Sequence, residues 1–214
     1  MLEIINFILG PFETNCYLVA DTDTNKAAVI DPGWDGKAIL SEALGRGWQI
    51  GHIWLTHAHF DHFGGASVIA DGCNPAIPIA LHQADYPLWR ANGLASLFGF
   101  KIDPGPEPTV DLYDGQIVHL GNIQFIVYHC PGHSPGHVIF HCPKEQVVFC
   151  GDVIFNSGIG RTDGPGGDYY GLIKSINEKI LTLPDNTRLL CGHGNETTVG
   201  DERRWNPFLN DERA

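Results

Sequence analysis

Three histidines and one aspartate stand within six consecutive residues of this 214-residue chain. They belong to Thr56-His57-Ala58-His59-Phe60-Asp61-His62, which follows the apolar run Ile53-Trp54-Leu55. Imidazole nitrogens and carboxylate oxygens together form metal sites. Side chains alternate along an extended segment, so we expect His57, His59 and Asp61 to share one face and His62 to point elsewhere. One short segment could then serve two metal ions, whereas a histidine-rich surface loop fits poorly with only 11 histidines in the whole chain.

Three later motifs each place a residue of ligand type just after a strand-like run. Glycine accompanies the ligand-type residue in every motif, and the motifs are Cys130-Pro131-Gly132-His133, Gly151-Asp152 and Gly192-His193-Gly194. Glycine permits tight turns, so these side chains can converge on one pocket. Each motif alone is weak evidence, but together with the histidine segment they predict an active site.

Short apolar runs bounded by Gly, Pro, Asn or Asp predict the strands that must carry these motifs. The expected strands are residues 2–8, 16–20, 27–30, 52–55, 77–81, 116–120, 123–128, 137–142, 147–150 and 188–191. Helices are expected over residues 36–45 and 169–183 and directly after Gly64-Gly65. Residues 75–108 are rich in proline and aromatic side chains and are expected to form a loop-and-helix flap that could cover a site. No repeat or linker divides the chain, so residues 1–214 are predicted to form one domain with two sheets covered by helices.

Composition indicates a globular enzyme and excludes several partners. A net charge of -12 argues against nucleic acid and against anionic membranes. The apolar stretch at the N-terminus lacks a basic start and is closed by Pro11, so we do not expect a signal peptide, and no run is long enough to span a bilayer. The six cysteines form no C-x-x-C pair and are expected to be reduced, mostly buried thiols in the cytoplasm.

The four motifs resemble those of the metallo-β-lactamase superfamily over nearly the whole chain. This resemblance implies a four-layer α/β/β/α sandwich with two metal ions between the ends of its sheets. It also implies a ligand set in which Asp152 bridges the ions. The first ion would be held by His57, His59 and His133, and the second by Asp61, His62 and His193.

Within that superfamily the chain looks most like the glyoxalase II-like thioester hydrolases. The motifs that carry this likeness are Gly10-Pro11-Phe12-Glu13-Thr14-Asn15-Cys16-Tyr17, Pro131-Gly132-His133, Ile159-Gly160-Arg161-Thr162-Asp163 and Asn206-Pro207-Phe208. The implied substrate is a glutathione thioester such as S-lactoylglutathione. The C-terminus departs from the family, because only 21 residues follow His193 and Leu209-Asn210-Asp211 stands where the family has a basic residue.

The ligand types also define the chemistry. Two neighbouring divalent ions can share a water, lower its pKa and present the resulting hydroxide to a carbonyl. Asp61 is the best candidate for orienting or accepting the proton of that water, although its role could be ligation alone. The donor set favours Zn²⁺ and also accepts Fe or Mn. A thioester suits such a site because its thiolate leaves without a dedicated acid.

Arg161 is a candidate substrate-binding residue, since a cation in its glycine-rich turn could face a substrate carboxylate; pairing with Asp163 is the equally weighted alternative. The remaining histidines are assigned to structure or surface, with His137 a possible support for a ligand. Two other functions stay open. A persulfide dioxygenase of the same superfamily would hold one iron through His57, His133 and Asp152. A non-catalytic protein with a structural metal is less favoured, because structural zinc sites are usually closed and cysteine-rich.

Overall fold

The computed structural model describes residues 1–210, and within this range the strands form two mixed six-stranded sheets and one small hairpin. The first sheet has the order β1-β2-β3-β4-β5-β6. Its strands are β1 (Leu2–Leu9), β2 (Thr14–Asp21), β3 (Lys26–Ile30), β4 (Gln49–Trp54), β5 (Ile79–His82) and β6 (Val110–Leu112). The first three strands pair antiparallel, and β3 to β6 run parallel.

The second sheet has the order β14-β13-β10-β9-β8-β7. Its strands are β7 (Ile117–Leu120), β8 (Ile123–His129), β9 (Val138–Cys142), β10 (Val147–Gly151), β13 (Arg188–Cys191) and β14 (Thr197–Thr198). Only the β10–β13 pair is parallel. The short hairpin of β11 (Ile154–Phe155) and β12 (Gly158–Ile159) follows β10.

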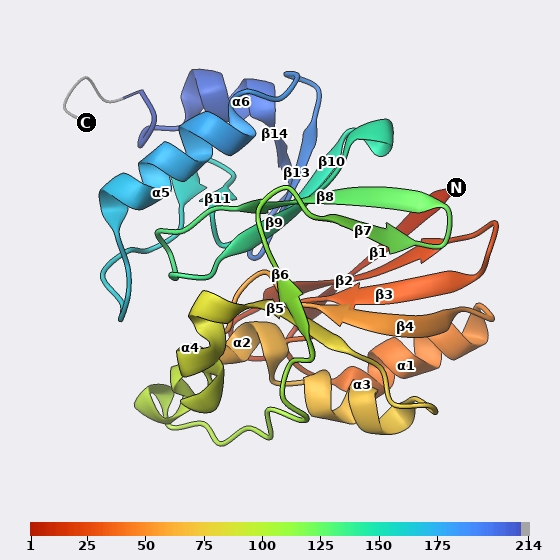
Figure 1. Ribbon diagram of the computed structural model, residues 1–214. Coiled ribbons are helices and arrows are strands. Elements are labelled where there is room, and N and C mark those ends of the chain that lie inside the picture. Colours follow the sequence, from red (N-terminus) through yellow and green to blue (C-terminus); the bar gives the residue numbers. More distant parts are fainter. Residues whose placement is uncertain (211–214) are drawn as a thin grey trace.

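Helices cover the outer face of each sheet, which completes four layers (Figure 1). On the first sheet lie α1 (Gly36–Gly45), α2 (Phe60–Phe63) and α3 (Ala66–Gly72). On the second lie α5 (Tyr169–Ser175), which continues as the π-helical turn Ile176–Ile180, and α6 (Val199–Trp205). The predicted four-layer α/β/β/α sandwich of the metallo-β-lactamase type is therefore the observed architecture.

Three apolar clusters fill the spaces between these layers. The first joins α1 and α3 to the first sheet, and the third joins α5 to the second sheet. The middle cluster lies between the sheets, where Trp54 stacks on Phe140 with ring centroids 5.4 Å apart. Because both sheets bury both faces, their central strands read as continuous apolar runs, as fully buried strands do.

Most expected elements were placed within two or three residues of their observed bounds. Helix α1 has its predicted ends, whereas the expected helix over residues 169–183 ends at Ile180. Strands β6, β11, β12 and β14 and helix α6 were not anticipated. The four strands are two or three residues long, too short for their periodicity to show, and they exist because longer neighbours offer backbone partners.

The segment over residues 75–108 contains β5 and, between β5 and β6, folds into short helices. They are a 3-10 turn at Gln83–Asp85, α4 (Tyr86–Arg90) and a kinked helical segment at Asn92–Phe98. All six cysteines are free and five are buried, as expected for reduced thiols. Among residues 1–210, no helix combines the length and apolar character needed to cross a membrane.

Candidate metal centre

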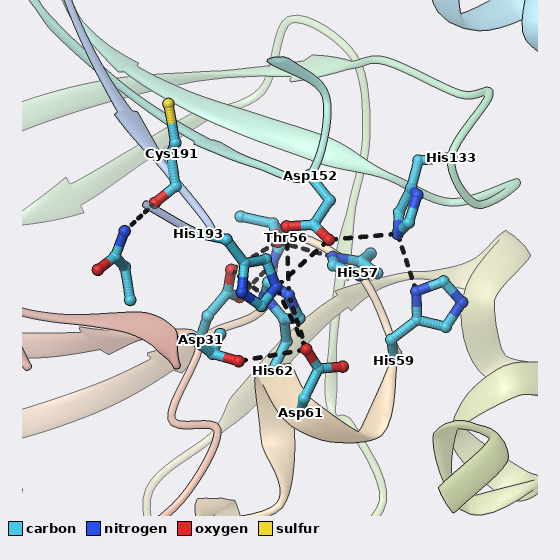
Figure 2. Close-up of polar contacts among 12 residues, drawn as sticks. Asp31, Thr56, His57, His59, Asp61, His62, His133, Asp152, Cys191 and His193 are labelled. Carbon is cyan, nitrogen blue, oxygen red and sulfur yellow. Dashed lines mark hydrogen bonds and ion pairs between the residues drawn. The ribbon is translucent and has the colours of Figure 1, made fainter. Parts of the chain in front are cut away.

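The ligand-type residues come from four loops that meet where strands of the two sheets end (Figure 2). The segment after β4 carries His57 to His62, and the β8–β9 loop carries His133. Asp152 directly follows β10, and His193 stands two residues after the end of β13. All seven residues singled out from the sequence as metal ligands are therefore brought into one region.

His57, His59 and His133 form the first group. Their ring centroids are 4.7 to 4.8 Å apart, and His59 Nδ1 lies 2.9 Å from His133 Nε2. Each ring offers one nitrogen within 4.8 Å of the others. His57 and His133 are buried, so this group is shielded from solvent.

Asp61, His62 and His193 form the second group. His193 Nε2 lies 3.3 Å from Asp61 Oδ2, and His62 Nε2 lies 3.6 Å from the same oxygen. Alternation along an extended segment wrongly placed Asp61 on the face of His57 and His59, whereas the observed grouping with His62 and His193 is the one that the family resemblance implied. The reason is local: the chain is extended only as far as His59, and Phe60–Phe63 then form one helical turn.

Asp152 lies between the two groups. Its Oδ1 is 3.3 Å from His62 Nε2, and its Oδ2 is 3.6 Å from both His133 Nε2 and His193 Nε2. One carboxylate thus contacts members of each group. This is the position from which a carboxylate can bridge two metal ions.

Hydrogen bonds to Nδ1 orient four of the imidazoles. His57 Nδ1 contacts Thr56 Oγ1 at 3.0 Å and His62 Nδ1 contacts Asp31 Oδ2 at 3.0 Å. His133 Nδ1 contacts the backbone carbonyl of Arg161 at 2.8 Å, and His193 Nδ1 contacts the backbone carbonyl of Phe12 at 3.0 Å. An oxygen acceptor at Nδ1 fixes the tautomer and leaves the Nε2 lone pair directed inward.

The nitrogen and oxygen atoms that point inward are better suited to binding a divalent metal ion than to hydrogen bonding with one another. Among residues 1–210, His57 Nε2, His62 Nε2 and Asp152 Oδ1 are buried and have no hydrogen-bond partner. A buried polar atom without a partner is costly, and a cation between these lone pairs would remove that cost. The mixture of neutral imidazole and carboxylate is also the donor set of divalent transition metals.

The charges of His57, His59 and Asp152 agree with this fit. Burial lowers the pKa of His57 well below its ordinary value, and burial beside His133 lowers the pKa of His59 to about 3, so both rings are neutral donors. Burial alone would raise the pKa of Asp152, but His62, His193 and His133 outweigh it and keep the group ionised. Burial opposes a charge on His62, yet Asp152 and Asp61 raise its pKa, so a metal ion would have to displace that proton.

Sequence reasoning missed two carboxylates that hold the centre in place. Asp31 accepts hydrogen bonds from the Thr56 amide at 2.8 Å and the Thr56 hydroxyl at 2.6 Å, besides contacting His62. Asp85 accepts from the Ala58 amide at 3.0 Å, from Ser134 Oγ at 2.7 Å and from the Gly136 amide at 2.6 Å. The position of Asp31 at the end of a strand was an available signal, but nothing near Asp85 in the sequence marks its role.

His137 and the N-terminal motif also support the ligands. His137 Nε2 accepts a hydrogen bond from the Asp152 amide at 3.0 Å, and its ring stacks on His57 with centroids 4.7 Å apart. Asn15 Nδ2 donates to the carbonyls of Cys191 and Gly194, which holds the His193 loop against β2. The expectation that His137 could support a ligand thus has a direct geometric basis.

Arg161 lies at the rim of the cavity in front of the ligands. Its guanidinium donates to Asp163 through Nε at 2.8 Å and Nη2 at 3.2 Å, and its side chain is 61% exposed. The side chain thus makes the ion pair with Asp163 that was considered as an alternative to substrate binding. Its backbone carbonyl has a separate structural contact with His133.

Comparison with known proteins defines the family. The model of the metallo-β-lactamase superfamily matches residues 9–193, and the chain belongs to that superfamily. Family membership and the His/Asp cluster together make the protein a metal-dependent hydrolase that uses divalent ions.

Similar proteins carry several different names. The hydroxyacylglutathione hydrolase GloC of Haemophilus influenzae is 36% identical over 207 residues, which cover 93% of this chain and 94% of that protein. The crystal structure of the BLEG-1 B3 metallo-β-lactamase is 39% identical with a TM-score of 0.90, and the alignment covers 98% of this chain and 100% of that chain. The crystal structure of TTHA1623 in a di-iron-bound form is 39% identical with a TM-score of 0.87, and the alignment covers 96% of this chain and 100% of that chain.

Proposed function

We propose that this protein is a binuclear thioester hydrolase that cleaves a glutathione thioester such as S-lactoylglutathione to a hydroxy acid and a thiol. His57, His59 and His133 would hold the first ion, and Asp61, His62 and His193 the second. The observation that carries the proposal is the position of Asp152 between these two groups, with contacts to both. The likeness to a hydroxyacylglutathione hydrolase over almost the full length of both chains supports the choice of substrate.

When bound, divalent ions at this centre would supply Lewis acidity for the substrate carbonyl and an acidified water as nucleophile. The protein's own contribution is orientation and proton transfer. Asp61 Oδ2 accepts a hydrogen bond from Thr14 Oγ1 at 3.2 Å, which holds the carboxylate beside His193. His62 and His193 keep the pKa of Asp61 below its ordinary value against the opposing effect of burial. We assign Asp61 the role of orienting, and accepting a proton from, the attacking water.

The surroundings of the centre favour a leaving group that needs no protonation. Apart from Arg161, the described residues that line the cavity offer no titratable side chain outside the His/Asp cluster. A thiolate leaves readily without a proton, whereas an alkoxide or an amine leaving group benefits from a general acid. This supports a thioester over an ordinary ester or amide.

The metal and the role of Arg161 are parts of the same proposal. Zn²⁺ is our first choice for both positions, with Fe or Mn as substitutes, since a similar protein was crystallised in a di-iron-bound form. We assign Arg161 to a carboxylate of the substrate. Its present partner Asp163 is 75% exposed, and exposed ion pairs are weak enough for a substrate carboxylate to compete.

The alternative function is a mononuclear iron persulfide dioxygenase that would use His57, His133 and Asp152. Nothing in the geometry favours it, because it would leave Asp61, His62 and His193 without a task although they are gathered as closely as the first group. It remains a useful comparison because it consumes oxygen and the hydrolase does not.

One purified sample can separate these functions. Metal content is measured first, and the sample is then supplied with S-lactoylglutathione while thiol release is followed, and with glutathione persulfide while oxygen is followed. The proposal expects about two metal ions per chain, thiol release and no oxygen uptake. One tightly bound iron with oxygen uptake, and no thiol release, would replace the proposed function by the alternative.

A further inference from the structure

The cavity in front of the metal centre has two chemically different sides. Its volume is about 220 Å³. One side is formed by the ligand-type residues His59, Asp61, His133, Asp152 and His193. The other side is formed chiefly by apolar residues from four separate parts of the chain, namely Phe12, Phe60, Leu94, Leu97, Phe98 and Pro165. We define this apolar set as the apolar wall.

Aromatic contacts join the parts of the apolar wall. The ring centroid of Phe12 lies 5.2 Å from that of Phe60 and 5.5 Å from that of Phe98, and the plane of the Phe12 ring is nearly perpendicular to both of the other ring planes. Phe98 also lies 5.5 Å from Phe60. The β1–β2 turn, the histidine segment and the 75–108 segment are therefore packed together at the cavity through these rings.

Three large side chains of the apolar wall are exposed, although Phe60 is buried. Leu97 is 72% exposed, Phe98 is 47% exposed and Phe12 is 36% exposed. Such side chains, contiguous and beside a cavity, indicate a surface that is completed by a ligand. Because they line the same cavity as Asp61 and His133, a group that covers them would lie in the cavity that holds the reacting carbonyl.

The backbone adopts a costly conformation at Leu94. Asn92, Gly93 and Leu94 have φ angles of 53°, 58° and 65°, which asparagine and glycine tolerate but which are unfavourable for leucine. Gly93 approaches so closely that a Cβ atom there would overlap the backbone of Phe60. This packing places Leu94 at the cavity beside the histidine segment, and strained backbone of this kind is concentrated at functional sites.

Charge points the same way. Arg161 is the one cationic side chain outside the His/Asp cluster among the described residues lining the cavity, and it is paired with Asp163. Glutathione carries two carboxylates, and only one of them could meet Arg161. Outside Arg161 and the metal centre, the lining offers the rest of a substrate mainly apolar contact.

From these observations we infer that the apolar wall binds an apolar substituent of the thioester, carried by either its carbonyl carbon or its sulfur, so that the protein prefers apolar thioesters to small polar ones. This inference rests on the proposed thioester hydrolysis and specifies its substrate class. The wall forms no bond to the substrate; it removes the substituent from water beside the metal centre.

Two substrate series test the inference and locate the substituent. In the first, glutathione is constant and the acyl group is acetyl, butyryl or hexanoyl. In the second, acetyl is constant and the thiol is ethanethiol, butanethiol or hexanethiol. The values of kcat/KM should rise roughly threefold for each methylene that enters the cavity, in the series whose variable part meets the wall. A flat response in both series, with hydrolysis present, overturns the inference and leaves the proposed function standing.

A matched pair of variants connects the preference to the wall. Leu97→Ala should reduce the hexanoyl-to-acetyl ratio, or its thiol counterpart, by roughly threefold to tenfold. Leu44→Ala removes a leucine that is 80% exposed on α1, away from the cavity, and should leave the ratio unchanged. Equal changes in both variants, or none in Leu97→Ala, would contradict the assignment.

Binding provides a readout that does not require turnover. Affinities of the metal-loaded protein for ethanethiol, butanethiol and hexanethiol can be measured by calorimetry. Affinity should increase along this series and increase less in Leu97→Ala than in Leu44→Ala. If no thioester is hydrolysed, the proposed function fails, and the thiol affinities still decide whether the wall binds apolar groups.

Discussion

Asp61 is the residue on which both ligation and proton transfer converge. It lies 3.3 Å from His193 Nε2 and accepts a hydrogen bond from Thr14. Asp61→Asn keeps the size of the side chain but removes its charge, so turnover should fall by about 10²- to 10⁴-fold. The measurement is kcat/KM for S-lactoylglutathione together with the metal content of the same sample.

A control variant makes the same chemical change elsewhere. Asp71→Asn alters an exposed carboxylate on α3 and should leave turnover unchanged. If Asp61→Asn retained near-normal turnover with a full complement of metal, Asp61 would have only a structural role, and another group would have to accept the proton.

Arg161 allows a test of substrate charge. Arg161→Ala should raise KM for S-lactoylglutathione by roughly tenfold with a smaller change in kcat, because one charge-assisted contact is lost. A short neutral thioester should be hardly affected. Asp163→Asn, which frees the guanidinium from its ion pair, should lower KM or leave it unchanged. Equal losses for charged and neutral substrates in Arg161→Ala would show that the side chain supports its turn instead.

At the scale of elements, Asp85 is the connection between two loops that belong to different sheets. Its carboxylate accepts from Ala58, which stands between His57 and His59, and from Ser134 and Gly136, which flank His133 on its C-terminal side. Burial raises the pKa of Asp85 above its ordinary value, and the bonds from Ser134 and Gly136 only partly oppose this effect. The loops that carry His57, His59 and His133 are thus held together by hydrogen bonds to one buried side chain.

Asp85→Asn should therefore disturb the first metal group without touching a ligand. An amide cannot accept at both ends, so one buried N–H loses its partner and the free energy of unfolding should fall by about 2 to 3 kcal/mol. Metal affinity, measured by chelator competition, should fall by roughly 10- to 100-fold. Asp103→Asn, an exposed carboxylate that accepts from Ser67 and Gly105, is the control and should leave metal affinity unchanged. Unchanged affinity in Asp85→Asn would assign Asp85 to folding alone.

At the scale of the whole molecule, the centre exists only because the two sheets are fixed relative to each other. His193 and Asp152 follow strands of the second sheet, while Asp61 and His62 follow a strand of the first. We expect about two metal ions per chain by elemental analysis. His193→Ala should lower this to about one, because it removes a ligand of the second group only. Full activity of the unaltered protein with a single ion, and no second site on titration, would contradict the binuclear proposal.

Asp21 gives a pH-dependent measure of how the sheets are joined. It ends β2 in the first sheet and accepts a hydrogen bond from the Asn122 amide in the β7–β8 turn of the second, at 2.8 Å. Burial alone would raise the pKa of Asp21, but bonds from Asn122, Thr24 and Asp23 outweigh it and lower the pKa to about 2. A lowered pKa in the folded state means that the stabilisation is complete above about pH 4 and is lost as pH falls toward 2.

The test compares the unaltered protein with Asp21→Asn, both treated with a chelator so that metal loss does not contribute. At pH 6 the variant should be less stable by roughly 1 kcal/mol after allowance for solvent screening. The difference should shrink as the pH is lowered from 4 to 2.5. A difference that stays constant over this range would show that Asp21 acts through its shape rather than its charge.

The sequence by itself determined the sheet-forming runs and the chemical identity of the centre. Fully buried strands such as Val147–Gly151 are continuous apolar runs, and such runs are readable because burial on both faces leaves no place for polar residues. The segment His57 to His62 stood out because histidine and aspartate are rarely so dense, and His133, Asp152 and His193 stood out because each follows a strand-like run within a glycine-containing motif. The single domain over residues 1–214 stays a prediction.

The tertiary structure decided which way each of those side chains points and what surrounds them. Asp61 joined His62 rather than His57 because the chain turns into a helix at Phe60, a change that alternation along a strand could not foresee. The roles of Asp85 and of the apolar wall could not be predicted from the sequence, because their contacts join residues far apart in the chain. Asp85 contacts Ser134, and Phe12 contacts Phe98. Local periodicity reports which face of an element is buried, but contacts between distant segments arise only when the two sheets pack and bring their loops together.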